Sequence, residues 1–232
     1  MFLMFHPLFW VMVGPAFLIA LWAQYRVKTT FAKYSQVKAR SGMSGARAAQ
    51  EIIRAEGLDV TVEPIPGQLT DHYDPRSKTL RLSEPVYGGT SLAALGIAAH
   101  EAGHAIQHAR GYAPMALRSA IVPAASLGST MAMPLFFFGL IFGGARGLPF
   151  GMYLMMAGIV IFAAVVAFQI VTLPVEFNAS TRAVRLLTTQ GIVTDEEAAG
   201  AKRVLSAAAL TYVAAALQGI LTLLYLIMRA RR

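Results

Sequence analysis

Four stretches of this sequence contain no Lys, Arg, Asp or Glu, and they constrain the fold more than any other feature. They run from Met1 to Tyr25, from Ser119 to Ala145, from Leu148 to Val175 and from Val204 to Met228. Each exceeds the roughly 20 residues that an α-helix needs to cross the hydrocarbon core of a bilayer. The sequence therefore predicts a mainly α, polytopic membrane protein with about four membrane helices, near residues 3–25, 120–142, 150–173 and 205–228.

The second of these runs is the least regular. It contains Pro123 and Pro134 together with Gly128 and Gly139. Because proline removes a backbone donor from a helix, a buried or re-entrant segment is an alternative to a full membrane span here.

Basic residues mark the expected cytoplasmic side. The first run is followed by Arg26, Lys28, Lys33, Lys38 and Arg40. Positive charge accumulates in short cytoplasmic segments, so we expect the N-terminus outside and the region from residue 26 in the cytoplasm. The segment 176–203 is also basic and suits the same side, whereas the C-terminal arginines fall outside, against the rule. These patterns predict an integral membrane protein, which we expect in a bacterial cell membrane.

The net charge of +8 raises the question of a nucleic-acid partner. The charges are spread along segments that flank the apolar runs, and no nucleic-acid-binding motif accompanies them. We therefore expect the lipid bilayer, with its anionic headgroups, as a partner and no nucleic acid. The chain has no cysteine, which excludes disulfides and thiolate metal ligands.

The polar region 26–118 has room for one small domain of mixed α+β type. Ser41 or Ser44 can cap a helix over residues 46–54 that ends at Gly57. Residues 60–62 alternate as a short strand, which the following prolines at 64 and 66 should end.

A second alternating stretch, residues 79–83, predicts another strand. Between the two strands, residues 71–76 contain Asp-Pro and predict a turn. A free edge of the 79–83 strand could hold an extended peptide by main-chain hydrogen bonds, while an ordinary packed strand is the alternative.

The next helix, expected over residues 91–110, contains the pattern His-Glu-x-x-His at His100, Glu101 and His104. Positions i and i+4 share one face of a helix, so both imidazoles can reach one ion. Imidazole nitrogens suit zinc, and Glu101 beside the ion can accept a proton from water. The pattern predicts a Zn²⁺-dependent hydrolase with Glu101 as its catalytic base.

A catalytic zinc site needs a third protein ligand. Glu176 follows the third apolar run, and two spans return the chain to the face that carries His104. A carboxylate buried there is costly unless something pairs it, and a metal ion would do so. His108 and His72 are competing ligands, and an interfacial charge is the alternative interpretation of Glu176.

Four stretches, residues 69–76, 98–107, 172–180 and 207–215, resemble the motifs of the YugP-like family of membrane zinc metallopeptidases. The layout is more distantly similar to gluzincins, in which a downstream Glu-x-x-Ala-Asp supplies the third ligand. Glu176 and Ala179 match that pattern. Ser180 stands where the aspartate would orient a ligand histidine, and Asn178 could take the role of that aspartate instead. The resemblance implies a membrane-embedded zinc peptidase with a zincin-like catalytic region.

These features together predict a zinc-dependent endopeptidase that hydrolyses peptide or membrane-protein substrates at or near the membrane. We expect a first membrane helix at 1–25, a catalytic region at 26–118, and membrane helices at 119–232 that carry the third metal ligand. Candidates for stabilising the oxyanion are Tyr212, His72, Tyr73 and Arg203.

Two other classes of function remain open. One is a non-catalytic membrane scaffold or chaperone, which Glu101 argues against because a structural zinc site needs no base. The other is an ion-coupled transporter that uses Glu176 as an intramembrane ion site.

Overall fold

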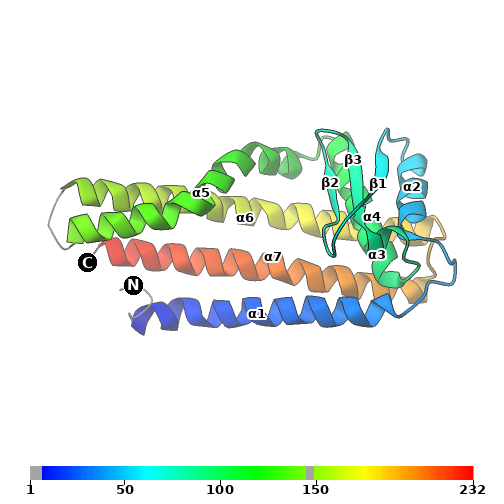
Figure 1. Cartoon of the computed structure of the whole chain (residues 1–232), viewed down its shortest axis with the longest axis horizontal. Coiled ribbons are helices and arrows are strands. Elements are labelled where there is room, and N and C mark those ends of the chain that lie inside the picture. The colour runs from blue at the N-terminus through cyan, green and yellow to red at the C-terminus, as the bar shows by residue number, and fades with distance from the viewer. Residues whose placement is uncertain (1–6, 145–148, 232) are drawn as a thin grey trace. The chain divides into compact units, whose positions relative to one another are not determined.

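The computed structural model describes residues 7–144 and 149–231 of the chain. Within these residues the chain forms seven helices and three strands (Figure 1). In chain order they are α1 Pro7–Ser35, α2 Gly45–Ala55, β1 Thr61–Ile65, β2 His72–Asp74, β3 Thr79–Ser83, α3 Glu84–Tyr87, α4 Leu92–Ala109, α5 Ala113–Gly144, α6 Pro149–Thr189 and α7 Asp195–Ala230. The prediction of a mainly α fold with a small α+β region is confirmed.

Four of the described helices, α1, α5, α6 and α7, are long and apolar enough to cross a membrane, as predicted. Three of them extend well beyond the predicted spans: α1 continues to Ser35, α6 to Thr189, and α7 begins at Asp195. Hydropathy marks only the part of a helix that suits hydrocarbon, and polar residues continue the same helix beyond it.

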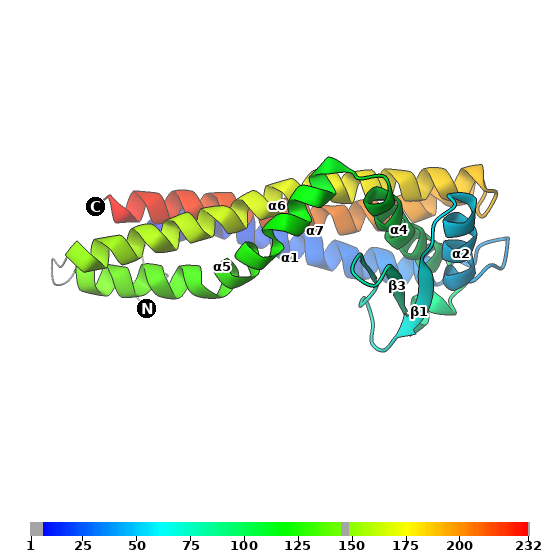
Figure 2. The same cartoon turned by 90° about the horizontal axis from the view of Figure 1, so that it is seen from above.

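Helix α5 is continuous from Ala113 to Gly144 and includes both Pro123 and Pro134. Figure 2 shows that it bends along its length, as expected of a helix with internal prolines. The second apolar run is therefore part of a single helix that is long and apolar enough to cross a membrane, which favours a full span over a buried or re-entrant segment.

The chain forms two compact units. One contains the described residues within 1–22, 117–173 and 211–232, and its apolar core includes Val13, Phe136, Ile159 and Tyr225. The other contains residues 23–116 and 174–210, so it joins α2, α3, α4 and the sheet to the polar ends of α1, α6 and α7.

The sheet of the second unit has the strand order β1-β3-β2. Strand β3 pairs in parallel with β1 and antiparallel with β2, so β3 is the central strand. The strand predicted at 79–83 is confirmed, but the expectation that its edge is free is wrong, because β1 and β2 occupy both edges.

Two further predictions in this region are corrected. Strand β1 continues through Pro64 to Ile65, which an edge strand tolerates because the proline has a pairing partner on one side only. Residues 72–74, inside the stretch predicted to be a turn, form β2, and the turn follows at Pro75–Lys78. The Asp74 carboxylate accepts hydrogen bonds from the Arg76 N–H and the Ser77 hydroxyl, which stabilises that turn.

Helix α4 lies at the centre of the second unit. It begins after Ser91, whose hydroxyl accepts a hydrogen bond from the Ala94 N–H, and it packs against α2 and β2. Both views show the strands beside α2 and α4 (Figures 1 and 2). Because most of α4 is buried, the side chains of the His-Glu-x-x-His pattern face the protein interior.

Candidate metal centre

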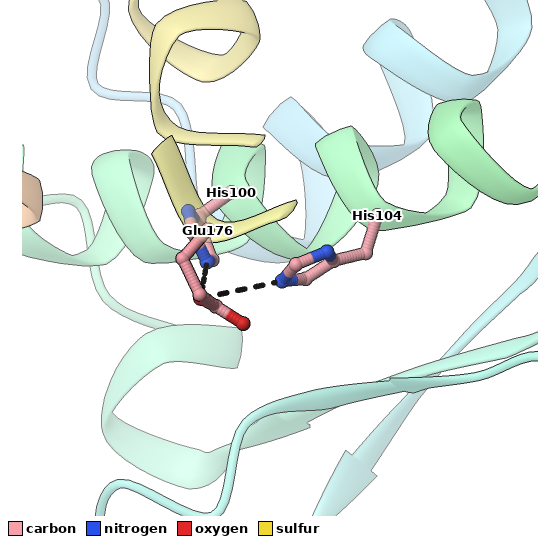
Figure 3. Close-up of side chains that lie close together, drawn as sticks. All are labelled: His100, His104 and Glu176. Carbon is pink, nitrogen blue, oxygen red and sulfur yellow. Dashed lines mark hydrogen bonds and ion pairs between the residues drawn. The ribbon is translucent and has the colours of Figure 1, made fainter. Parts of the chain in front are cut away.

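His100 and His104 on α4 lie beside Glu176 on α6 (Figure 3). Oxygen Oε2 of Glu176 is 3.2 Å from Nε2 of His100 and 3.7 Å from Nε2 of His104. Glu176 is only 2% exposed and His104 only 7% exposed. All three residues belong to the second unit, so the cluster lies inside one compact body.

The donor atoms have the spacing that a tetrahedral zinc ion requires. Two ligands at about 2.1 Å from such an ion lie about 3.4 Å apart. One donor atom from each of His100, His104 and Glu176 lies within 4.8 Å of the others, and the two measured separations of 3.2 and 3.7 Å bracket the tetrahedral value. Two imidazoles and one carboxylate also form a donor set found in catalytic zinc sites, with a fourth position for water. The residues therefore fit a catalytic zinc ion.

Negative charge surrounds the imidazoles. Burial by itself lowers the pKa of His104, but the hydrogen bond to Glu176 and the nearby Glu101 and Glu176 carboxylates raise this pKa overall. Glu101 is 8% exposed and lies next to His100 on α4. Two carboxylates thus face a buried pair of imidazoles, an arrangement that favours a divalent cation.

Close contact between α4 and α6 brings the three side chains together. A Cβ added at Gly103 would lie 2.9 Å from the Ala179 carbonyl oxygen, so the two backbones meet where α4 has no side chain. Ala179 is three residues after Glu176 and one before Ser180. Gly103 therefore allows α6 to place Glu176 and Ser180 near the imidazoles.

The second nitrogen of His100 contacts Ser180. The Ser180 hydroxyl is 3.2 Å from Nδ1 of His100. A hydroxyl that accepts the Nδ1 proton leaves Nε2 free to bind a metal. Ser180 therefore lies where its hydroxyl can orient the His100 ring, whereas Asn178 contacts Gln107 and Arg182.

Gln107 makes the corresponding contact with His104. Its Oε1 is 3.0 Å from Nδ1 of His104, and its Nε2 donates to the carbonyl of Val175 and to Oδ1 of Asn178. Gln107 is fully buried. Gln107 was not predicted to have a role, although a polar residue three positions after the second histidine of the pattern, on a mostly apolar helix, was a usable indication.

The direction of these hydrogen bonds fixes the tautomer of His104. The Arg182 guanidinium, which can only donate, bonds to Oδ1 of Asn178. Gln107 must therefore present its amide nitrogen to Asn178 and its oxygen to His104. That oxygen only accepts, so Nδ1 of His104 carries the proton and Nε2 has a lone pair for a metal.

The other sequence candidates lie outside the three-residue cluster. His108 is hydrogen bonded to the Tyr73 hydroxyl at 2.9 Å, and His72 to the carbonyl of Thr70. Burial, with a smaller effect from Asp74, raises the pKa of Tyr73, so its hydroxyl stays protonated at neutral pH.

Two candidates for stabilising the oxyanion lie on α7. Arg203 donates to the hydroxyl of Tyr34, and Tyr212 belongs to the other compact unit.

Comparison with known proteins agrees with this chemistry. Residues 9–231 match the model of a family described as "Putative neutral zinc metallopeptidase". A protein of Bacillus subtilis (strain 168), "Putative membrane protease YugP", is 47% identical over 211 residues, which cover 90% of this chain and 91% of that protein. No solved structure matches the chain. The chain belongs to the family of neutral zinc metallopeptidases that this model describes.

Proposed function

We propose that this protein is a zinc-dependent endopeptidase of the cell membrane, which cleaves peptide bonds of proteins or peptides at or near the bilayer. The observation that carries the proposal is the convergence of two imidazoles and one buried carboxylate beside Glu101. Membership of a zinc metallopeptidase family supports it. From the basic segments that flank the apolar runs, we propose that the catalytic region faces the cytoplasm.

In this proposal His100, His104 and Glu176 hold the zinc ion. When bound there, zinc would act as a Lewis acid and lower the pKa of water. Glu101 accepts the proton of the attacking water and later delivers it to the amine that leaves. Ser180 and Gln107 hold the two imidazole rings in the orientation that directs Nε2 toward the ion.

We further propose that an extended substrate adds to the sheet at β2. Strand β2 lies at an edge of the sheet and packs against α4, whereas β1, the other edge strand, packs against α2 and α3. Main-chain hydrogen bonds to an edge strand can hold a peptide whatever its side chains are. An edge beside the His-Glu-x-x-His helix would present the scissile bond near the three ligands.

Metal analysis and one conservative variant test the chemistry. The purified chain should contain about one zinc per molecule. Glu101→Gln keeps the size of the side chain and removes the proton acceptor, so its zinc content should stay the same and its activity should fall by a factor on the order of 10² or more. Membrane proteins that accumulate in cells with the variant, relative to cells with the parent, are candidate substrates and supply the assay. Full activity of the variant would refute the role of Glu101.

The ligand set has a separate test. Glu176→Ala should lose most of its zinc and be less resistant to heat, because the ion joins α4 to α6. Glu176→Asp should be intermediate, since its carboxylate is one methylene short. If Glu176→Ala binds zinc as tightly as the parent, the ligand set is wrong.

The orientation can be tested because the chain has no cysteine. Single cysteines at Ser44 and Thr194 should both resist an impermeant thiol reagent applied to intact cells. Labelling of both cysteines would show that the catalytic region faces the outside, and labelling of one alone would contradict the arrangement of four spans.

A further inference from the structure

A basic groove lies between α1 and α7 in the second unit. It encloses about 620 Å³. Most of its lining residues are cationic or carry a hydroxyl group, and three are apolar. The lining residues are Arg26, Thr29, Thr30, Lys33, Tyr34, Ala199, Lys202, Arg203, Ser206, Ala207 and Leu210.

Four cations surround this groove, and no acidic side chain is among the described residues that line it. Two of the cations come from each helix: Arg26 and Lys33 from α1, and Lys202 and Arg203 from α7. Arg203 donates a hydrogen bond of 2.9 Å to the hydroxyl of Tyr34, which is buried. Tyr34 thereby holds one of the cations along the wall, and the groove is suited to an anion.

The groove lies where both helices change from polar to apolar sequence. Arg26 is the first charged residue after the apolar run of α1, and Arg203 is the last before the apolar run of α7. Ala207 and Leu210, two of its apolar lining residues, follow Arg203 along α7 into that apolar run. From Lys202 to Leu210 the groove follows α7 for about 12 Å, at about 1.5 Å per residue. It therefore joins a cationic site to the start of a membrane-spanning surface.

We propose that this groove binds the phosphate of an anionic phospholipid, whose acyl chains leave past Ala207 and Leu210. A free phosphate ion would bind the cations and hydroxyls but would make no favourable contact with the apolar residues Ala207 and Leu210. A lipid uses both, and its phosphate already lies at the depth where a chain passes from headgroup to hydrocarbon. The site is independent of the metal centre and of the proposed peptidase activity.

The proposal can be tested with the full chain in detergent and short-chain lipids. The probes are dioctanoyl phosphatidylglycerol, dioctanoyl phosphatidylcholine and inorganic phosphate, with binding followed by native mass spectrometry. The groove variant is Lys33→Gln/Lys202→Gln, since both lysines are exposed. The control is Lys28→Gln/Arg47→Gln, which removes the same charge from exposed positions that do not line the groove. Thermal unfolding and zinc content show whether each variant is folded.

The parent should prefer phosphatidylglycerol to phosphatidylcholine. Each lysine near the headgroups contributes about fivefold to affinity, so the groove variant should bind phosphatidylglycerol about 30-fold more weakly. The control should bind within a factor of about three of the parent, and Lys33→Arg/Lys202→Arg should bind like the parent. Equal loss in the control would show diffuse attraction to the surface, and unchanged affinity in the groove variant would also overturn the proposal. If inorganic phosphate displaces phosphatidylglycerol at equal concentration, the ligand is a free anion and the assignment to lipid is wrong.

Discussion

Gly103 offers the sharpest test of how the metal centre is built. We consider Gly103→Ala, with Gly96→Ala on the same helix as its matched control. The new Cβ at position 103 would lie 2.9 Å from the Ala179 carbonyl oxygen, whereas the one at position 96 would lie 3.4 Å from the nearest atom, the Cβ of Ala201. The first contact is about half an ångström too short for ordinary packing and involves rigid backbone.

The expected energies follow from this difference. Either substitution stabilises a helix by about 0.8–1 kcal/mol through propensity alone. Overpacking at position 103 costs about 1–3 kcal/mol. Gly96→Ala should therefore be neutral or slightly stabilising, and Gly103→Ala should be less stable than that control by about 1–3 kcal/mol.

The effect on zinc should be more specific than the effect on stability. A displacement of α6 by half an ångström moves Glu176 and Ser180 together, and metal–ligand distances tolerate only about 0.2 Å. Zinc affinity, measured by competition with a chromophoric chelator, should fall at least about tenfold in Gly103→Ala and stay unchanged in Gly96→Ala. Thermal unfolding of both variants in detergent gives the stability comparison. If the two variants bind zinc equally well, the close approach at Gly103 does not position the ligands and the reasoning fails.

Three further predictions concern side chains around the imidazoles, and chelator competition measures each. Gln107→Leu should lower zinc affinity about 10- to 100-fold, because His104 loses the acceptor that fixes its tautomer; unchanged affinity would contradict the hydrogen-bond chain described above. Ser180→Ala should lower zinc affinity and Ser180→Asp should raise it, since a carboxylate is the stronger acceptor for an Nδ1 proton; no change in either would mean that the contact with His100 is incidental. His108→Ala should keep the zinc of the parent, because His108 bonds to Tyr73 instead of joining the cluster; loss of zinc would reassign it as a ligand.

Local sequence patterns predicted the features that depend on a few neighbouring residues. Of the two candidate helix caps, Ser41 and Ser44, the structure has Ser44, and the extent of the 79–83 strand was predicted correctly, since each depends on short-range geometry. The shared face of His100 and His104 follows from the helical repeat in the same way. Glu176 was singled out by a different argument, because two membrane spans must return the chain to the side that it left.

Features that depend on packing between distant segments were not predicted. The pairing of Gln107 with Asn178 joins positions 71 residues apart, and no periodicity in either segment indicates it. The local sequence does not show why a glycine is needed at position 103, because the reason lies in the backbone of α6. Strand β2 was missed since its three residues form a strand only by pairing with β3.

The position of Glu176 has a consequence for the synthesis of the chain. Under the proposed ligand set, the ribosome completes His100 and His104 long before it reaches Glu176, and two apolar segments must leave the insertion machinery in between. During that interval the nascent chain has two of three ligands and lacks the α6 backbone that carries Ser180 and Asn178. A peptidase assembled in this order acquires its hydrolytic centre only after its third span is in the bilayer, so unfinished copies cannot cut the proteins being inserted beside them.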